Sequence, residues 1–409
     1  MKLKFRTVAP ALIAVALLTA ACSSSNGSSS TTTGGGSTNN ATGSPITIGG
    51  IGDLTGVSSS PQPTQGMTAY ANFVNTHGGI NGHKLVFLSC DGAEDPNKFA
   101  SCGHNFASNS AVVASTDLGG DQFAQSDPIL AAAGIGIVNS NPVTQSEFNT
   151  PNGVAATGGV PTSLGALVKY FATAKHIKTI AFTGPNGIGA QIEAIIQNFA
   201  TPYKITVTPY LFPETTTDYT ATATALAASK ADLIIGASGV SAVGPILLAL
   251  KAAGNTIPVA FFDTSITPQA ITQAGSASDG LYSTDAFPTP ATATGQDKTT
   301  LNDYAAGMKA AGQPEGTGSL QGWATGVMLT TIIKALGVQN ATRAAILNVI
   351  QNGSINNAPL FPATMSKKST APPIPTFSSL INPNEFIGQF QNGKFVILPG
   401  VGRVNPYTA

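Results

Sequence analysis

The sequence predicts an α/β protein with two doubly wound lobes, each built on a parallel sheet. Continuous apolar runs, typical of strands buried on both faces, alternate with amphipathic helical patterns along most of the chain. The alternation begins again after Gly158-Gly159, so the pattern occurs twice. Residues 45–409 also exceed the size of one ordinary hydrophobic core, which favours two lobes over one.

The first series of elements occupies residues 46–138. One helical pattern places Met67, Tyr70 and Phe73 on the same face and ends at Gly78-Gly79, which stop a helix. The expected strands are 46–51, 84–88, 111–114 and 136–138, and the expected helices are 67–77, 96–108 and 121–133.

The second series begins with a helix marked by Leu164 and Phe171. Ile188 and Phe199 mark the apolar face of the next helix, and Asp218 is placed to cap the N-terminus of a third. The remaining helix is expected at 243–250, and the strands at 179–182, 205–212, 233–236 and 259–262.

The C-terminal part is less regular. Helices are expected at 323–336 and 342–351, followed by a Pro-rich stretch that reaches residue 375. The Gln-Asn-Gly sequence between 386–390 and 394–398 indicates a β-hairpin. Phe261, Phe262 and Trp323 are expected in cores, as large aromatic side chains usually are.

The N-terminus has the features of an export signal. Basic residues up to Arg6 precede an apolar run at 8–18, which is too short to span a bilayer permanently. Thr19-Ala-Ala-Cys22 then resembles the lipobox of bacterial lipoproteins, although that pattern prefers Leu where Thr19 stands. We therefore expect a signal peptide at 1–21 and a lipid on Cys22; the alternative is a signal peptide without lipidation.

Residues 22–44 are expected to form a flexible linker. Residues 23–43 are almost wholly Ser, Thr, Gly and Asn and contain no apolar cluster that could join a core. Such a chain spans on the order of 25 Å root-mean-square. The linker would hold a folded body clear of a membrane surface.

Composition limits the function and the cysteine chemistry. The net charge is zero and only 9% of residues are charged, so no basic surface favours nucleic acid. Three cysteines are present. If Cys22 carries lipid, Cys90 and Cys102 remain as a pair that an oxidising compartment would join in a disulfide. Two buried thiols are the alternative.

The sequence lacks the common signatures of enzymes. It contains no HExxH, GxSxG or GxxxxGK[ST] motif, and the glycines at Gly50, Gly52 and Gly56 are out of register for a dinucleotide fingerprint. The four histidines are scattered singly, without metal-ligand spacing. We expect no enzyme activity, no cofactor and no metal.

Several segments are similar to one protein family. The chain resembles the leucine/isoleucine/valine-binding family of ABC-transporter substrate-binding proteins, which are type I periplasmic binding proteins. The resemblance covers about residues 46–287 and is weaker beyond. The segments that carry it are ITIGGIGDLTG at 46–56, NTHGGINGHKLVF at 75–87, CDGAEDPNKFASC at 90–102, AAAGIGIVNSNPVT at 131–144 and QAGSASDGLY at 273–282.

The resemblance implies two lobes that are joined by three crossing segments and close around a ligand. We expect the crossings near 155–161, near 284–288 and between 353 and 362. The first lobe would then comprise 45–158 plus 286–355, and the second 159–285 plus 356–409. The Cys90 and Cys102 pair also looks like a bridge seen in many relatives.

In the first lobe the resemblance points to three ligand-binding candidates. Gly120 stands where the family has a Ser that binds a carboxylate, so only backbone amides at Gly120 and Asp121 could bind there, and Asp121 would repel an anion. Gly120 could instead simply allow the turn. Thr144 matches a family Thr that contacts the carboxylate; capping the following helix is its alternative role.

In the second lobe the candidates are Asp263 and Ser238. Asp263 falls where the family has a Glu that pairs with the ammonium of the substrate, and a carboxylate can do this by a charge-assisted hydrogen bond. Its alternative role is helix capping. Ser238 lies in a loop that supplies an aromatic contact in relatives but has no aromatic residue here.

The function implied by the resemblance is solute capture for an ABC importer. We expect an extracytoplasmic monomer, anchored to a bacterial cell membrane through Cys22, that binds a small polar solute such as an amino acid or a related carboxylate or amide. It would deliver this solute to ABC permease subunits. A ligand sensor of the same fold, signalling to a membrane partner, is the alternative.

The anchor prediction can be tested by fractionation. Protein lacking residues 1–22 should be recovered in the soluble fraction, because neither the apolar run nor the lipid would then attach it to a membrane. Recovery of the shortened protein with the membranes would contradict the assignment.

Overall fold

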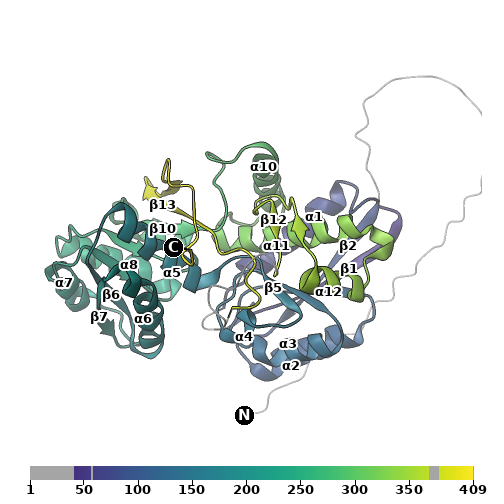
Figure 1. The fold of residues 1–409 in the computed structure, drawn as a ribbon, viewed down its shortest axis with the longest axis horizontal. Coiled ribbons are helices and arrows are strands. Elements are labelled where there is room, and N and C mark those ends of the chain that lie inside the picture. The colour runs from purple at the N-terminus through teal and green to yellow at the C-terminus, as the bar shows by residue number, and fades with distance from the viewer. Residues whose placement is uncertain (1–40, 57–58, 368–376, 409) are drawn as a thin grey trace, which may run out of the picture. The chain divides into compact units, whose positions relative to one another are not determined.

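The computed structural model describes residues 41–56, 59–367 and 377–408 and confirms the predicted fold class (Figure 1). The described chain forms two lobes, each with a sheet whose central strands are parallel. The expected signal peptide, Cys22, most of the linker and residues 368–376 of the Pro-rich stretch lie outside the described residues.

The first lobe contains a parallel five-stranded sheet with the order β2-β1-β3-β4-β5. Successive side chains point to opposite faces, so Val138 packs in one core while Ile137 packs in another. The strands are β1 Gly43–Gly52, β2 His83–Asp91, β3 Val112–Asp117, β4 Gly136–Asn139 and β5 Gly153–Ala155.

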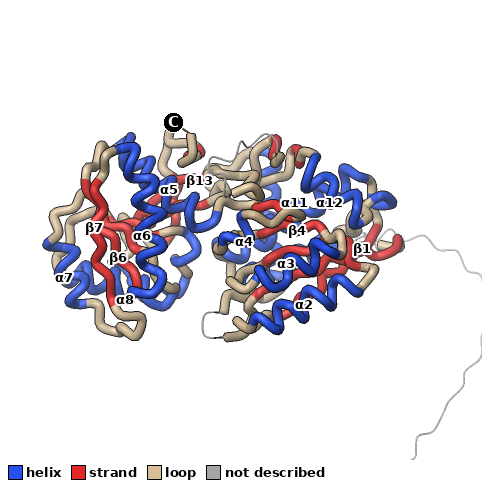
Figure 2. Tube along the Cα trace, turned by 60° about the horizontal axis from the view of Figure 1, so that its bottom comes forward, coloured by secondary structure: helices blue, strands red, loops and turns tan. Residues whose placement is uncertain are grey.

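Helices cover both faces of this sheet (Figure 2). One core combines strand residues with α1 Gln62–Thr76, α11 Thr317–Leu336 and α12 Arg343–Asn352. The other combines them with α2 Pro96–Ser108 and α3 Phe123–Ala132. This two-faced cover explains why the strands are apolar throughout instead of alternating.

The second lobe contains an eight-stranded sheet. Its main order is β14-β13-β10-β9-β8-β6-β7, and β15 pairs with β13. The predicted hairpin is confirmed as an antiparallel pair that extends the parallel strands through β10. The strands are β6 Thr179–Pro185, β7 Thr206–Phe212, β8 Leu233–Gly236, β9 Val259–Phe261, β10 Tyr282–Asp285, β13 Glu385–Gln391, β14 Lys394–Ile397 and β15 Arg403–Val404.

Two further cores lie on the faces of this second sheet. One includes residues of α5 Gly159–Ala174 and α6 Asn186–Ala200. The other includes residues of α7 Thr220–Ala228, α8 Val240–Ala252 and α9 Pro268–Ala274. Ile188 does not join these cores, because its side chain is 47% exposed, so its expected place on the buried face of its helix is wrong.

The chain passes between the two sheets three times. It leaves β5 at Ala155 and enters α5 at Gly159, and it returns after Asp285, since Ala286 already packs in the first lobe. The third passage lies after Ile381, which still belongs to the core of the first lobe, and before Glu385 in the second sheet. The expected position of this passage, between 353 and 362, is therefore wrong.

Some elements begin earlier than their periodicity indicates or have weak periodicity. Helix α1 starts at Gln62 instead of residue 67, with a proline in its first turn, a position that tolerates proline. Helix α10, Gly295–Ala310, was not predicted because its few large apolar residues are widely spaced.

The predicted helix cap at Asp218 is displaced by one residue. Asp218 accepts a hydrogen bond from Thr220 N at 2.9 Å, but the N-cap residue of α7 is Tyr219.

Helices α1 and α11 pack unusually close together. A Cβ atom at Gly66 would collide with the backbone of Ser319, and one at Gly322 would collide with the backbone of Pro63. Trp323 is buried beside this contact, with Tyr70 and Tyr304 against its ring at centroid distances of 5.1 and 5.7 Å. The two glycines therefore allow the backbones of the two helices to touch near their N-terminal ends.

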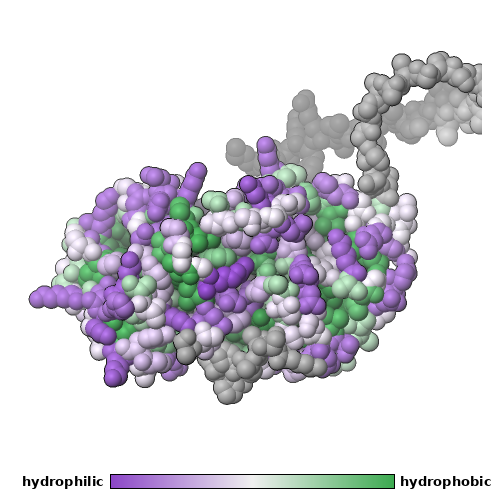
Figure 3. Space-filling view, turned by 45° about the horizontal axis from the view of Figure 1, so that its top comes forward, coloured by the Kyte–Doolittle hydropathy of each residue, from purple (hydrophilic) through white to green (hydrophobic). Residues whose placement is uncertain are grey.

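The surface in Figure 3 combines strongly hydrophilic and nearly neutral side chains, with hydrophobic ones in smaller groups between them. This fits a chain in which few residues are charged and Ser, Thr and Gly are frequent. Among the described residues, no helix is long and apolar enough to cross a membrane.

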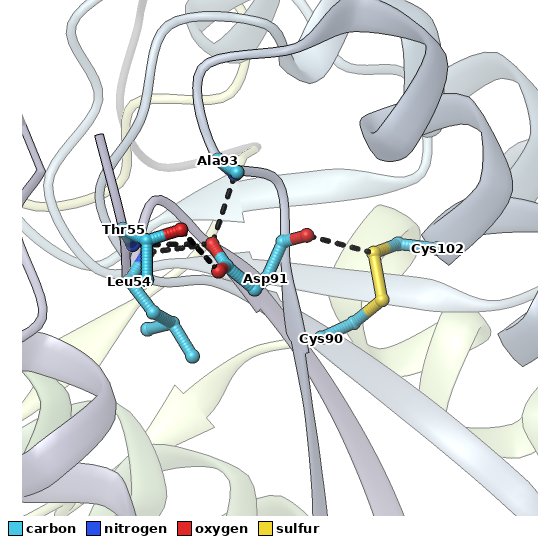
Figure 4. The surroundings of a disulfide bond; sticks show 6 residues. All are labelled: Leu54, Thr55, Cys90, Asp91, Ala93 and Cys102. Carbon is cyan, nitrogen blue, oxygen red and sulfur yellow. Dashed lines mark hydrogen bonds between the residues drawn. A yellow bond between two sulfur atoms is a disulfide. The ribbon is translucent and has the colours of Figure 1, made fainter. Parts of the chain in front are cut away.

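Cys90 at the end of β2 and Cys102 on α2 are joined by a disulfide in the structure (Figure 4). Their Cα atoms lie 5.8 Å apart, within the usual range for a disulfide. The bond ties the end of the edge strand β2 to the helix that covers it.

The bond can be tested by counting thiols in protein that lacks residues 1–22, where only Cys90 and Cys102 remain. No thiol should react in the denatured, unreduced protein. Replacing both residues by alanine should lower the free energy of unfolding by about 3 kcal/mol, as the chain-entropy model gives for a loop of this length. Two reactive thiols in the unreduced protein would contradict the pairing.

Candidate functional site

A cavity of about 800 Å³ lies between loops of the two lobes. From the first lobe it is lined by the segments that follow β1 and β3 and by the N-terminal parts of α1 and α11. From the second lobe it is lined by the segments that follow β8 and β9. These are carboxyl ends of parallel strands and starts of helices, where open α/β sheets bind their ligands.

A second cavity of about 620 Å³ adjoins the first. It is bordered by α9, by the β13–β14 hairpin and by the start of α11, and its lining includes Ile271, Phe390 and Phe395. Both cavities are bordered by Ile266, Thr267, Pro268, Gly316 and Thr317.

Asp53 forms part of the floor of the larger cavity. It directly follows β1, and its side chain is only 4% exposed. Its Oδ1 accepts a hydrogen bond from Glu94 N at 2.7 Å. Its backbone N–H donates to Gly119 O at 2.8 Å, which joins this loop to the one after β3.

The loop that carries Asp53 is held by the carboxylate of Asp91 (Figure 4). Asp91 accepts hydrogen bonds from Leu54 N at 2.9 Å, from Thr55 Oγ1 at 2.6 Å and from Ala93 N at 2.9 Å. Burial acts to raise the pKa of Asp91, but these hydrogen bonds outweigh it and lower the pKa below its ordinary value. Asp91 follows Cys90, so the disulfide and the carboxylate together fix the base of the loop.

Gly120 and Asp121 both line this cavity, where the sequence places ligand candidates. A Cβ atom at Gly120 would lie 2.9 Å from Asp53 Oδ2 and 2.8 Å from the ring of Phe99, and its φ of +156° disfavours other residues. Gly120 therefore leaves the space that Asp53 Oδ2 needs. Asp121 is exposed and accepts a hydrogen bond from Gln122 Nε2 at 3.0 Å.

Thr144 is placed in its alternative role, as a helix cap. It forms a capping box with Glu147 at the start of α4 Gln145–Phe148, and its Oγ1 donates to Glu147 Oε2 at 2.8 Å. Thr144 is not among the residues that line the cavity, although its neighbour Val143 is. Glu147 is buried, which raises its pKa despite hydrogen bonds that act in the opposite direction.

Asp263 and Ser238 lie just behind the cavity wall. Ser238 is buried, and its hydroxyl has no hydrogen-bond partner among the described residues. Asp263 opens the short helical turn η2 Asp263–Ser265 and is buried, which raises its pKa to about 6. Its Oδ2 accepts a hydrogen bond at 3.3 Å from Nε2 of Gln321, a residue of α11 that does line the cavity.

The lining of the cavity is acidic and rich in amides. Its charged residues are Asp53, Glu94, Asp121 and Glu315, and it includes no Lys, Arg or His among the described residues. It also includes no aromatic residue in the part of the chain that the structure describes. The amide side chains are Gln62, Gln65, Gln122, Asn141, Gln269 and Gln321.

Acidic residues are also buried where the chain passes between the sheets. Burial, followed by the charge of Asp263, raises the pKa of Asp285 to about 7. Glu385, at the third passage, is buried as well, and its pKa is raised well above the ordinary value for the same kinds of reason. Arg403 stands near them and donates hydrogen bonds to the backbone carbonyls of Ala286 and Leu360.

The described residues contain no group of three or more His, Cys, Asp or Glu side chains that could hold a metal ion. The acidic side chains of the cavity therefore do not converge on one point. They form instead a wide surface that can accept hydrogen bonds.

Sequence reasoning missed Asp53 and Gln321 as site residues. Asp53 could have been found, because it lies two residues after the strand predicted at 46–51 and so belongs to the carboxyl edge of the first sheet. Gln321 carries no comparable signal. It lies four residues into a helix whose apolar pattern becomes regular only at Trp323.

Comparisons with known proteins agree with this architecture. The family described as periplasmic binding protein matches residues 45–375, which is most of the chain. Comparison with curated protein sequences gave no match. The similar solved structures include a fatty acid ABC transporter substrate-binding protein from Thermomonospora curvata, which is 18% identical, with a TM-score of 0.71 over 88% of this chain and 92% of that one.

Two other solved structures have names that mention amino acids. A leucine binding protein from Thermotoga maritima is 14% identical, with a TM-score of 0.69 over 88% of this chain and 99% of that one. A branched-chain amino acid transporter substrate binding protein from Streptococcus pneumoniae, in complex with isoleucine, is 16% identical, with a TM-score of 0.66 over 86% and 97%. At identities this low, the structural similarity establishes a shared fold and nothing more. The family match over residues 45–375 adds a relationship in sequence. The chain therefore belongs to the periplasmic binding protein family.

Proposed function

We propose that this chain is an extracytoplasmic, lipid-anchored solute-binding protein of an ABC importer. It captures a small polar solute, an amino acid or a related small carboxylate or amide, in the cavity between its lobes. It then presents the solute to ABC permease subunits while the lipid on Cys22 keeps it near them. It acts as a monomer.

The observation that carries the proposal is the cavity of about 800 Å³ that both lobes line. Its side chains are mainly hydroxyls, amides and carboxylates, which bind polar solutes through hydrogen bonds. Asp53 and Gln321 come from the first lobe, and Thr264 and Gln269 from the second. A solute that contacts both groups would hold the lobes together.

The three passages between the sheets support a closing motion. Hinge residues of such proteins are few and lie at the ends of elements, as Asp285 and Glu385 do. Ligand contacts made only when the lobes are closed would shift the equilibrium towards the closed state. A closed, loaded state is a form that a permease can distinguish from the empty one.

The names of the similar structures do not decide the solute. One names a fatty acid and another describes a complex with isoleucine. The described lining of this cavity has no aromatic residue, and most of its side chains carry hydroxyl, amide or carboxylate groups, which favours a polar solute over an acyl chain.

A thermal-shift screen of the full-length protein in detergent tests the proposal. Amino acids, small carboxylates, amides and polyamines would be screened as separate classes. One class should raise the melting temperature in a concentration-dependent way, because a ligand that binds only the folded state stabilises it. If no compound of any class shifts the melting temperature, the proposed function is contradicted.

A further inference from the structure

Asp53 presents an unused acceptor to the cavity. Its side chain is more than nine-tenths buried, and its Oδ1 is engaged by Glu94 N. Its Oδ2 forms no hydrogen bond with any described residue, and this oxygen is not fully buried. Since Asp53 lines the cavity, this oxygen is accessible from the cavity.

Gln321 presents a second acceptor. Its side-chain nitrogen donates to Asp263 Oδ2, and an ionised carboxylate can only accept, so the amide must turn its Nε2 towards Asp263. The oxygen of the same amide, Oε1, forms no hydrogen bond with a described residue and is not fully buried. Asp263 thus acts as a positioning residue that points the carbonyl oxygen of Gln321 into the cavity.

The charges around these acceptors have one sign. Asp121 and Glu315 line the same cavity, no basic side chain does so among the described residues, and Glu94 adds a fourth carboxylate. Burial, together with the charges of Asp121, Glu94 and Asp91, raises the pKa of Asp53, while the hydrogen bond from Glu94 N lowers it. A cation in the cavity would relieve this repulsion, whereas an anion would increase it.

The kind of cation follows from the groups that would bind it. Quaternary ammonium groups have no N–H and are usually bound by aromatic rings, of which the described lining has none. A bare metal ion needs several oxygen ligands around one point, and no such group of acidic side chains is present among the described residues. Carboxylate and amide oxygens that stand apart suit N–H donors.

We infer that the cavity selects solutes that carry a protonated amine or guanidinium, whose N–H groups bind Asp53 Oδ2 and Gln321 Oε1. This inference rests on the proposed function, because it names the ligand class of the same cavity. It also changes the assigned partner of the cation from Asp263 in the second lobe to Asp53 in the first. Basic amino acids, diamines and polyamines belong to this class.

Calorimetric titration of the full-length protein in detergent tests the inference with probes of equal chain length. The probes are 1,4-diaminobutane with two ammonium groups, 4-aminobutanoate with one ammonium and one carboxylate, and succinate with two carboxylates. The diamine should bind at least tenfold more tightly than succinate, and 4-aminobutanoate should lie between them. The hexamethylated diamine, which keeps the charge but has no N–H, should bind at least tenfold more weakly than the diamine.

Variants assign the effect to residues. Asp53→Asn should weaken diamine binding at least tenfold, while Asp218→Asn serves as the matched control because Asp218 is exposed and does not line the cavity. If Asp53→Asn lowers the melting temperature, the ratio of diamine to succinate affinity in the variant remains a valid measure, and it should fall at least tenfold. Asp263→Asn should reduce affinity less than Asp53→Asn.

Several results would overturn the inference. These are tighter binding of succinate than of diamine, no measurable diamine binding while another compound of the screen binds, an unchanged affinity in Asp53→Asn, or a larger loss in Asp263→Asn. Calcium chloride competing with the diamine at equal concentration would also overturn it. In each of these cases a solute is still bound and the proposed function stands, whereas no binding by any compound contradicts the proposed function itself.

Discussion

The carboxyl ends of parallel strands lie at one edge of a sheet, so the loops that follow them lie together there. The candidate site depends on this constraint of the topology. Residues after β1, β3, β8 and β9 line a single cavity although they are far apart in the sequence. No local sequence motif is needed to form this lining, because the topology places Asp53, Gly120 and Thr264 at the cavity once the two sheets form. The cores on both faces of each sheet then hold these loop ends in place.

Within that frame, a few polar contacts set the shape of the floor. Asp91 binds the loop after β1 through backbone and hydroxyl donors, and the neighbouring disulfide ties β2 to α2. The glycines at the α1–α11 contact allow the start of α11, with Gln321, to approach the start of α1. The carboxylate of Asp263 then sets the direction of the Gln321 amide across the two lobes.

Much of the fold could be predicted from the sequence because its signals are local. Asp95 caps α2 at Asn97 N and Pro96 opens the helix, so both ends of this helix were predicted correctly. The third passage could not be placed, since Ile355, Met365 and Ile381 pack in the first core although their surroundings show no strong helix or strand pattern. Its position depends on long-range contacts.

The roles of the site residues were harder to predict than the fold, because they too depend on contacts between residues that are distant in the sequence or on local bonds that the residue type does not reveal. Thr144 has the same residue type whether it caps a helix or contacts a ligand, and only its bonds to Glu147 distinguish the two. Asp263 lies behind the wall of the cavity, and its contact with Gln321 joins residues 58 positions apart. The spacing of residues predicts which loops meet at an edge, whereas the direction of a side chain depends on its tertiary partners.

The central claim is that one solute binds in the cavity between the two sheets, and a crystal structure of the complex tests it most directly. The compound that raises the melting temperature most would be co-crystallised with the protein. The account predicts density in this cavity, with polar atoms of the compound within hydrogen-bond distance of Asp53 and Gln321 and with contacts to both lobes. Density confined to the neighbouring cavity beside the β13–β14 hairpin, or contacts with only one lobe, would contradict it.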